Sequence, residues 1–301
     1  MDKRKFQFNN KNMKKLLYEN IKKSFESEGY TLLSKKYKNS YSYLRYVCPK
    51  HHTHKINWQC WSTGRRCFYC AKNIRKYTLN THYFNKIDTK NKAYFLGFLY
   101  ADGCNDGMTT KIQVSDKDIL LKLRKEIGSN TPIIIAKPRL IKFKKDSKSY
   151  MQKKSYILKL NSRYMCHKLS KLGCMSRKTF KLEFPNKTQL HTNLISHFIR
   201  GYFDGDGSLS FSKHKKGCSF TFIGRKNFCL RVKEILENRL EIKLTFNKYK
   251  THVFWTIQSG SIPNIKKILD FLYYDADIYL DRKYKKYTDF LKFKYEPFIV
   301  Y

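Results

Sequence analysis

Two short segments of the chain combine apolar residues at helical spacing with a terminal acid and glycine. They are residues 95–103 (FLGFLYADG) and residues 199–207 (IRGYFDGDG). In each, large apolar residues recur three or four positions apart, which predicts a helix with a buried face. Gly201 and Gly205 in the second segment are small and four positions apart, as are their counterparts in the first. Such spacing lets two helix backbones approach closely.

The two segments belong to a longer pattern that occurs twice. Each ends in Asp-Gly, and the glycines, Gly103 and Gly207, suit the left-handed residue that commonly ends a helix. The order that follows is strand, helix, strand, and the matching stretches are 111–115 and 219–223, then 118–127 and 226–239, then 156–162 and 255–261. With offsets of 99 to 108 residues, these landmarks predict an α+β fold of two pseudo-symmetric αββαββα units.

The predicted strands alternate apolar and polar residues. Lys159 lies between Leu158 and Leu160, and Phe220 and Phe222 share one strand face. This period of two predicts that one face packs against the helices and that the other is polar and open to a partner.

We divide the chain into four parts. Residues 1–75 hold an amphipathic helix followed by a Cys/His-rich stretch, and residues 76–91 are polar, basic and aperiodic, as in a linker. The first repeat is 92–190 and the second is 191–301. The N-terminal helix has one apolar face, formed by Met13, Leu16, Leu17, Ile21 and Phe25.

The charge of the chain indicates its class of partner. Lys and Arg number 63 against 23 Asp and Glu, a formal net charge of +40. A folded protein with this self-repulsion normally binds a polyanion, nucleic acid first and an anionic membrane surface second. The longest apolar run, residues 93–101, is far shorter than the ~20 residues that a spanning helix needs. We therefore expect no membrane association.

The cysteines and the N-terminus indicate the compartment. The first residues carry charge but no apolar signal region, so we expect an intracellular, unsecreted protein. Nine cysteines in uneven clusters then favour thiols and a metal over a disulfide framework. The abundance of Lys, Asn, Tyr, Phe and Ile is typical of an AT-rich genome, such as that of an organelle, phage or virus.

Asp102 and Asp206 are the candidate catalytic residues. A carboxylate at a helix C-terminus faces the negative end of the helix dipole, which costs some tenths of a kcal/mol. Two such helices side by side would add repulsion between the carboxylates. A divalent cation relieves both effects, and oxygen ligands with an open coordination shell suit Mg²⁺ completed by phosphate. The pattern predicts a metal-assisted phosphodiesterase in which each aspartate serves one strand.

The two segments resemble the LAGLIDADG signature of homing endonucleases, and the resemblance covers roughly residues 92–295. It implies a DNA-binding saddle and a catalytic metal bound by the eighth motif residues, Asp102 and Asp206. The seventh residues, Ala101 and Gly205, would add backbone carbonyls. The sixth position departs from the signature in the first repeat, where Tyr100 replaces an acid.

The same resemblance implies a lysine in each repeat that organises water around the nucleophile. Lys178 and Lys283 are the candidates, since each follows the last strand of its unit, and each follows an arginine (Arg177, Arg282) that would touch phosphate. A generic solvated or phosphate-facing lysine is the alternative. Asp116 matches a polar residue of that water network, on one side only, since Gly224 stands at the corresponding place.

A Cys/His cluster occupies residues 48–70. Cys67 and Cys70 form a Cys-x2-Cys pair, and Cys48 with a histidine three or four residues later completes the four N/S ligands of tetrahedral Zn²⁺. The stretch resembles treble-clef-like zinc fingers found beside homing endonuclease domains, which implies His52 as the fourth ligand, with His51 as its rival. The site would be structural and would position DNA. Buried or redox cysteines are the non-metal alternative.

Three functions remain in competition. The first is a monomeric, intron-encoded homing endonuclease that cuts double-stranded DNA at a long asymmetric site. The second is an intron RNA maturase or DNA-binding regulator on the same fold, with its own intron RNA as a partner. The third, a membrane-surface protein, explains the charge but neither the duplicated motif nor the cysteines. Metal-dependent DNA cleavage separates the first from the others.

Overall fold

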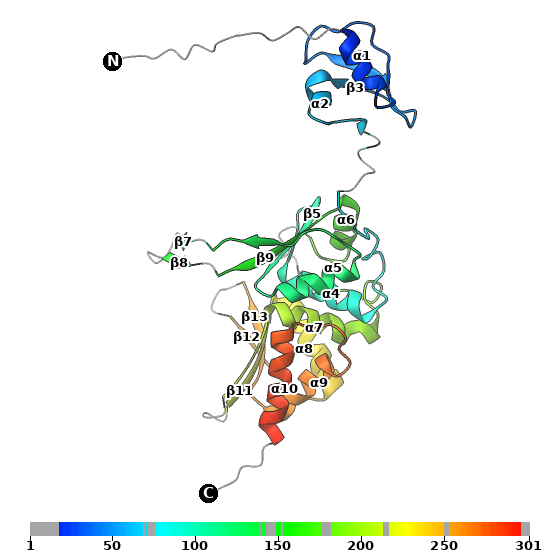
Figure 1. Ribbon diagram of the computed structural model, residues 1–301. Coiled ribbons are helices and arrows are strands. Elements are labelled where there is room, and N and C mark those ends of the chain that lie inside the picture. The colour runs from blue at the N-terminus through cyan, green and yellow to red at the C-terminus, as the bar shows by residue number, and fades with distance from the viewer. Residues whose placement is uncertain are drawn as a thin grey trace, which may run out of the picture. The chain divides into compact units, whose positions relative to one another are not determined.

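The structure is a computed structural model. It describes residues 18–68, 70, 76–138, 140–142, 149–151, 153–175, 182–212, 217–249 and 253–295. The chain divides into two compact units, residues 1–76 and 77–301. Each is described here by itself (Figure 1).

Within its described residues, the first unit contains a small three-stranded sheet and two helices. Its elements are α1 (Tyr18–Glu26), β1 (Thr31–Leu32), β2 (Tyr43–Val47), β3 (Thr53–Asn57) and α2 (Trp58–Ser62). Ile21 and Phe25 of α1 are buried as predicted, whereas Met13, Leu16 and Leu17 lie outside the described residues. Phe25 stacks on Trp61 with ring centroids 3.7 Å apart, which fastens α1 to α2.

The second unit mixes helices and antiparallel sheets. Its first half contains α4 (Lys90–Asp102), β4 (Gly103–Asn105), β5 (Thr109–Val114), α5 (Lys117–Glu126), β6 (Ile134–Ala136), β7 (Leu140–Lys142), β8 (Ser149–Met151), β9 (Ser155–Asn161) and α6 (Arg163–Lys171). Its second half contains η2 (Thr192–Leu194), α7 (Ile195–Asp206), β10 (Gly207–Ser212), β11 (Gly217–Gly224), α8 (Lys226–Leu240), β12 (Thr245–Lys248), β13 (Trp255–Ser259), α9 (Ile262–Tyr273) and α10 (Asp281–Tyr295). The predicted α+β class is confirmed.

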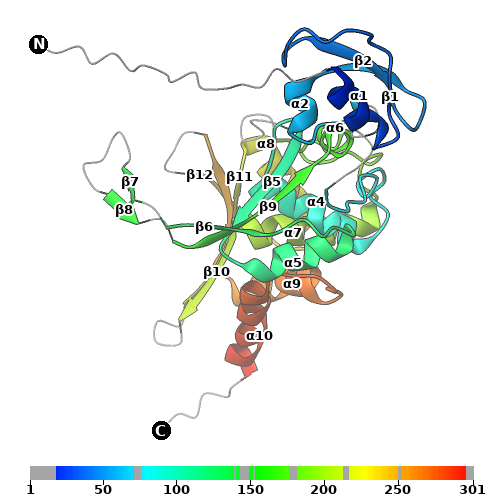
Figure 2. The same ribbon diagram turned by 45° about the horizontal axis from the view of Figure 1, so that its top comes forward.

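The two four-stranded sheets share one strand order. It is β4-β5-β9-β6 in the first half and β10-β11-β13-β12 in the second, and every neighbouring pair is antiparallel. The register also corresponds, since Gly103 pairs with Ile112 and Gly207 pairs with Phe222. Strands lie along one side of this unit and helices along the other (Figures 1 and 2).

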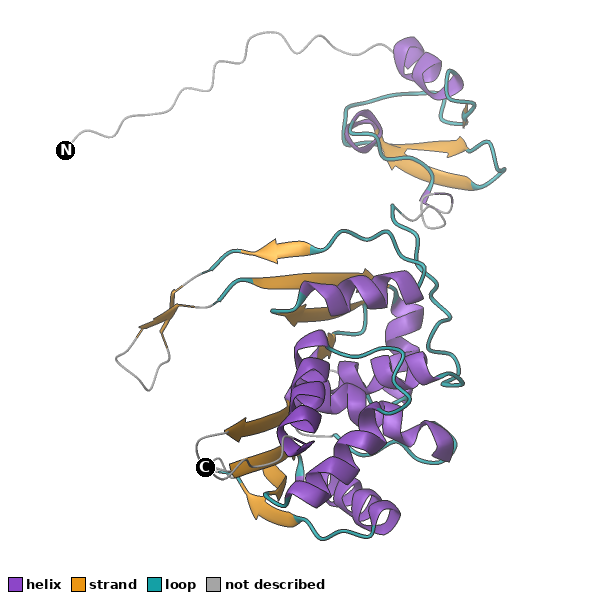
Figure 3. Cartoon of the chain, turned by 60° about the horizontal axis from the view of Figure 1, so that its bottom comes forward, coloured by secondary structure: helices purple, strands orange, loops and turns teal. Residues whose placement is uncertain are grey.

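The strands are two-faced, as their alternation predicts. Leu158 and Leu160 are buried while Lys159 between them is exposed, and Phe220 and Phe222 are buried together. Figure 3 shows the strands of the second unit in separate groups with helices packed beside them. The polar strand face therefore remains free of the helical layer.

Helices α4 and α7 pack directly on each other through two glycines. A β-carbon placed on Gly97 would lie 2.0 Å from the Phe198 carbonyl oxygen, and one on Gly201 would lie 1.9 Å from that of Tyr94. Either distance is far inside van der Waals contact, so only glycine fits. Both contacts have the same offset of 104 residues, since Gly97 corresponds to Gly201 and Tyr94 corresponds to Phe198. The small residues predicted to bring two helices together do so.

The glycines that end these helices have a different role from the one predicted. Gly103 has φ −78° and ψ 145°, and Gly207 has φ −86° and ψ 167°, so both are extended rather than left-handed. A β-carbon at either position would lie 2.6 Å from the carbonyl oxygen four residues earlier, that of Leu99 or Phe203. Glycine is needed because the chain turns from helix into strand without a connecting loop.

The segment expected to be a linker, 76–91, belongs largely to the second unit. Tyr83, Phe84 and Ile87 are buried in its core cluster. The boundary between the units falls at Lys76 and Tyr77, inside the expected linker. The segment packs as irregular turns, so its apolar residues have no regular spacing. The sequence pattern therefore could not predict that they contribute to the core.

Candidate active site and metal-ligand cluster

Asp102 and Asp206 are the last residues of the two paired helices. Asp102 is half-buried and Asp206 is exposed. A β-carbon on Gly205 would lie 2.8 Å from Oδ2 of Asp102 and 2.4 Å from Cβ of Ala101. The carboxyl group of α4 therefore lies against the last turn of α7. The duplicated motif predicts that Asp206, the next residue of α7, lies nearby.

Two cavities flank this pair of helix ends. One, of about 200 Å³, contains Asp102 and is lined by Phe98, Gln113, Val114, Ser115, Asp116, Gly205, Leu280 and Arg282. The other, of about 310 Å³, contains Asp206 and is lined by Tyr100, Ala101, Leu182, Tyr202, Ile223, Gly224, Arg225 and Phe254. Each cavity thus holds one of the two carboxylates.

Each cavity is built from both helices. Gly205 of α7 lines the cavity of Asp102, and Ala101 of α4 lines the cavity of Asp206. Asp102 therefore shares its cavity with the residue before Asp206, and Asp206 shares its cavity with the residue before Asp102. Ala101 and Gly205, the expected sources of carbonyl ligands, each line the cavity of the opposite aspartate.

The first cavity is rich in polar groups. Asp116 accepts a hydrogen bond from Nε of Arg282 at 2.9 Å, which joins the end of β5 to the start of α10. Gln113, which the sequence analysis did not single out, donates from Nε2 to the Ser155 hydroxyl at 3.0 Å. Asp116, Gln113 and Asp102 thus line one cavity, as expected for Asp116.

The second cavity differs in chemistry. The sheet register places Ile223 opposite Thr256 and Gln113 opposite Ile157, which makes apolar Ile223 the counterpart of Gln113. By the same register Gly224 corresponds to Val114, so the expected match of Gly224 to Asp116 is wrong. The Tyr202 hydroxyl donates to the Ile223 carbonyl at 3.1 Å and is also hydrogen-bonded with Asp206. Burial, followed by the charge of Asp206, raises the Tyr202 pKa well above its usual range, so this hydroxyl stays protonated.

Lys283 is buried beneath the C-terminus of α7. Its ammonium donates to the Phe203 carbonyl at 3.3 Å and to the Gly207 carbonyl. Burial lowers the pKa of Lys283 to about 8, against the attraction of Asp204. A cation that donates hydrogen bonds to the last carbonyls of the helix also offsets the negative end of its dipole, where Asp206 lies.

The other predicted lysine, Lys178, and its neighbour Arg177 lie outside the described residues. Arg282 lies in the first cavity, where it pairs with Asp116 as described above. Lys283 therefore lies at the C-terminal end of α7, while the role of Lys178 remains an expectation.

Asp204, the acid at the sixth motif position, is fully buried. It accepts hydrogen bonds from the hydroxyls of Tyr94 at 2.7 Å and Tyr273 at 2.5 Å, and from the backbone N–H of Leu280 at 2.8 Å. These donors belong to α4, α9 and the segment before α10. Burial raises the pKa of Asp204 despite these bonds. Asp204 joins elements and does not face either cavity.

Arg200, which replaces the small residue usual at its motif position, is also fully buried. It lies over the Tyr94 ring of α4, 5.2 Å from the ring centroid, and donates to the carbonyls of Leu272 at 2.8 Å and Ile278 at 3.1 Å. Its Nη1 lies 2.8 Å from Nδ1 of His197. Arg200 therefore holds the C-terminal segment without disturbing the close approach at Gly201.

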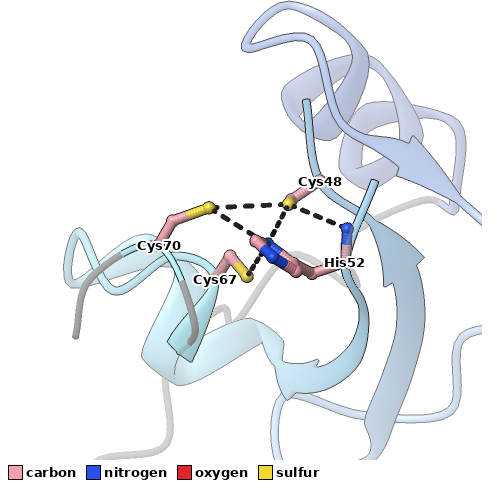
Figure 4. Close-up of side chains that lie close together, drawn as sticks. All are labelled: Cys48, His52, Cys67 and Cys70. Atoms are coloured by element: carbon pink, nitrogen blue, oxygen red, sulfur yellow. Dashed lines mark hydrogen bonds between the residues drawn. The ribbon is translucent and has the colours of Figure 1, made fainter. Parts of the chain in front are cut away.

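The first unit gathers four metal-ligating side chains. Cys48, His52, Cys67 and Cys70 offer ligand atoms that all lie within 4.8 Å of one another. Nδ1 of His52 is 3.4 Å from the Cys48 sulfur, 3.5 Å from that of Cys70 and 4.0 Å from that of Cys67. Figure 4 shows the four side chains converging on one point.

The donor set and its surroundings fit Zn²⁺. Three sulfurs and one imidazole are the ligands of a closed structural site, which leaves no position for a reacting water. His51 is exposed, has a left-handed backbone (φ 62°) and is absent from the cluster, so His52 is favoured over its rival. Backbone N–H groups bond the Cys48 sulfur and lower its pKa although burial opposes this, which favours the thiolate.

With this geometry established, the chain can be compared with known proteins. No family model and no curated protein match the sequence. Among solved structures, 78 chains match in fold.

Three of these structures illustrate the likeness. Meganuclease I-SmaMI bound to uncleavable DNA is 15% identical, covering 66% of this chain and 88% of that one, with a TM-score of 0.41. The LAGLIDADG homing endonuclease I-GzeII in complex with its DNA target is 15% identical, covering 66% and 88%, with a TM-score of 0.42. Full-length DUF199/WhiA from Thermatoga maritima is 14% identical, covering 72% and 66%, with a TM-score of 0.41.

No helix within the described part of the chain is both long enough and apolar enough to cross a lipid bilayer.

Proposed function

We propose that this protein is a site-specific double-strand DNA endonuclease of the LAGLIDADG homing type. The observation that carries the proposal is that each of the two cavities is lined by residues of both α4 and α7. Each contains one terminal aspartate and the backbone of the residue before the other aspartate. Two phosphodiester bonds on opposite strands need two such centres side by side.

The proposal includes a divalent metal, for which Mg²⁺ is the best fit. Asp102 and Asp206 would hold it, with carbonyl oxygens of Ala101 and Gly205, because hard oxygen ligands are what this cation prefers. When bound, it would supply charge neutralisation and activation of water at the phosphate. The protein's own contribution is positioning: Lys283 and Tyr202 act on the end of α7, and Asp116 with Arg282 frames the other cavity.

DNA would be bound along the polar faces of the two sheets. Lys111 faces Lys159 across β5 and β9, and Ser210 faces Ser219 across β10 and β11. Side chains of this kind contact phosphates and base edges in the major groove. The formal charge of +40 makes phosphate contacts the dominant source of affinity, which salt would weaken steeply.

We further propose that residues 92–190 and 191–301 are two related repeats in one monomeric chain, and that the Cys/His cluster holds a structural Zn²⁺ that helps to position DNA. The shared strand order and the reciprocal glycine contacts support the first point. The converging N/S ligands support the second. Intron encoding and an asymmetric target belong to the same proposal.

The decisive experiment is cleavage of DNA by the purified chain. Duplex libraries, randomised or derived from the host, are incubated with Mg²⁺, and products are sequenced. The comparison is with Asp102→Asn, Asp206→Asn and, as a control that removes two carboxylates outside both cavities, Asp275→Asn, Asp289→Asn. We expect discrete breaks that disappear in the first double variant and with a chelator, but persist in the control.

Binding of the same library without cutting, in the wild-type chain, would contradict the endonuclease. In that case binding of intron RNA would favour a maturase, and binding of one duplex sequence would favour a regulator. Equal cutting by the Asp102, Asp206 double variant would place the catalytic centre elsewhere.

A further inference from the structure

A separate cavity of about 360 Å³ shares no lining residue with the two cavities described above. It is bounded by residues 84–87, by the end of α6 and by residues 187–191. The first segment ends three residues before α4, and the last leads through η2 into α7. The aspartates lie at the opposite, C-terminal ends. Neither Asp102 nor Asp206 lines this cavity.

The lining of this cavity is strongly cationic. It contains four lysines and a histidine, namely Lys86, Lys168, Lys171, Lys187 and His191. None of the described residues that line it is acidic. Within the described parts of the chain, none of the four lysines forms an ion pair with a carboxylate. Lysines around one hollow repel one another, and an anion relieves that repulsion.

The frame of the cavity is ordered by its own contacts. Phe84 and Ile87 are buried in the core, so the first segment is fixed from below. Gln189 donates from Nε2 to the Lys171 carbonyl at 2.7 Å, which ties the last segment to the end of α6. Asn186 caps the turn before it by accepting from the backbone N–H groups of Thr188 and Gln189, both at 3.0 Å.

We propose that this cavity binds phosphate groups, either of a polynucleotide backbone or of a free nucleotide. Ammonium groups bind phosphate as mobile point charges, and several around one hollow can contact more than one phosphate oxygen. The volume exceeds that of a single phosphate, and Leu172 adds an apolar wall, so a nucleotide unit fits better than a bare ion. The site goes beyond the proposed endonuclease, whose phosphates would lie in the cavities of Asp102 and Asp206.

The test maps the reactivity of individual lysines in the full-length chain. Lysine acetylation is followed by mass spectrometry without ligand, with pyrophosphate, with a free nucleotide, with single-stranded RNA and with duplex DNA. We expect pyrophosphate to protect Lys86, Lys168, Lys171 and Lys187 together, while exposed Lys125 and Lys243 keep their reactivity. Protection by the nucleotide or by a polynucleotide identifies the source of the phosphate.

A variant pair separates this site from the general positive charge. Lys171→Gln, Lys187→Gln is compared with Lys125→Gln, Lys243→Gln, since Lys125 also ends a helix and Lys243 also lies in a loop. The first pair should weaken pyrophosphate binding about tenfold, as expected for two lost charge-assisted contacts, and the control pair should not. Uniform protection of all exposed lysines, or equal weakening by both pairs, would overturn the proposal. DNA cleavage, which would depend on Asp102 and Asp206, is measured in a separate assay. The phosphate-binding proposal and the endonuclease proposal can therefore fail independently.

Discussion

Gly205 and Ala101 face each other where α4 and α7 end, so closely that a β-carbon on Gly205 would lie 2.4 Å from that of Ala101. The contact places each residue beside the carboxylate of the opposite helix. The geometry of the candidate centres therefore depends on how near the two helices come, and that nearness depends on glycine.

Substituting Gly201 tests this dependence. Gly201→Ala would force a methyl group to within 1.9 Å of the Tyr94 carbonyl oxygen, so the helices must separate. We expect a loss of about 1–3 kcal/mol in the free energy of unfolding, measured with urea. Gly260→Ala is the control, because its β-carbon would meet its nearest neighbour, the Cys218 carbonyl, at 3.6 Å, and its cost should stay within about 0.5 kcal/mol. Equal losses would contradict the close-packing argument.

The two aspartates can be separated by strand. If each serves one strand, Asp102→Asn should leave nicking of one strand and Asp206→Asn nicking of the other. Each variant should slow cutting of its own strand about a hundredfold or more, as is usual when a group that stabilises the transition state is removed. Strand-specific end labels on the cleaved duplex measure both rates. Loss of both cuts in either variant would show that the two centres act as one.

Metal removal should affect the first unit selectively. Its core is small, and four of its side chains converge on one point, so metal binding and folding should be coupled. We expect one zinc per chain by elemental analysis, and loss of near-UV signal from Trp61 on chelation. Cys70→Ser should bind no zinc. Cys60→Ser should bind a full equivalent, because Cys60 lies outside the cluster. Full zinc content in Cys70→Ser would overturn the assignment.

Stability should fall in mild acid because of His197. Burial, with the charge of Arg200 beside it, lowers the pKa of His197 to about 4. The unfolded histidine binds a proton below about pH 6.5, whereas the folded one does not, so stability is lost as the pH falls from about 6.5 to 4. The full effect of this group is about 3 kcal/mol. Urea unfolding of wild type and His197→Gln at pH 7 and pH 5 measures it.

The variant should lose less stability between the two pH values than the wild type. The difference between the chains isolates His197 from other titrating groups, including Asp204, whose raised pKa acts in the opposite direction. The same loss in both chains would show that His197 takes up its proton without cost.

Local patterns in the sequence predicted much of this molecule. The helical spacing of apolar residues and the duplicated Asp-Gly predicted α4 and α7, each with an aspartate at its C-terminal end. The alternation of apolar and polar residues predicted the buried faces of β9 and β11. The four candidate zinc ligands followed from spacing and resemblance. These features depend on short-range periodicity or on residue types with few alternative uses, which is why they can be found without coordinates.

Long-range contacts were harder to predict. Gln113 has no motif around it, and it became visible only when strand register placed it in the cavity of Asp102. Tyr83 and Phe84 lie in a segment without regular spacing, so their burial could not be predicted. The extended conformation of Gly103 depends on the immediate turn into β4, where the usual rule for glycine at a helix end does not apply.

The hydrogen bond from Tyr94 to Asp204 makes the two halves of the second unit chemically distinct partners. At the offset of 104 residues, Tyr94 corresponds to Phe198, and Asp204 corresponds to Tyr100. Two copies of α7 would bury two carboxylates that lack this hydroxyl donor, and two copies of α4 would offer two hydroxyls without the carboxylate. Each half thus selects the other over itself. Split into separate chains, the halves would reassemble as a heterodimer, because a homodimer would lack the buried hydrogen bond from Tyr94 to Asp204.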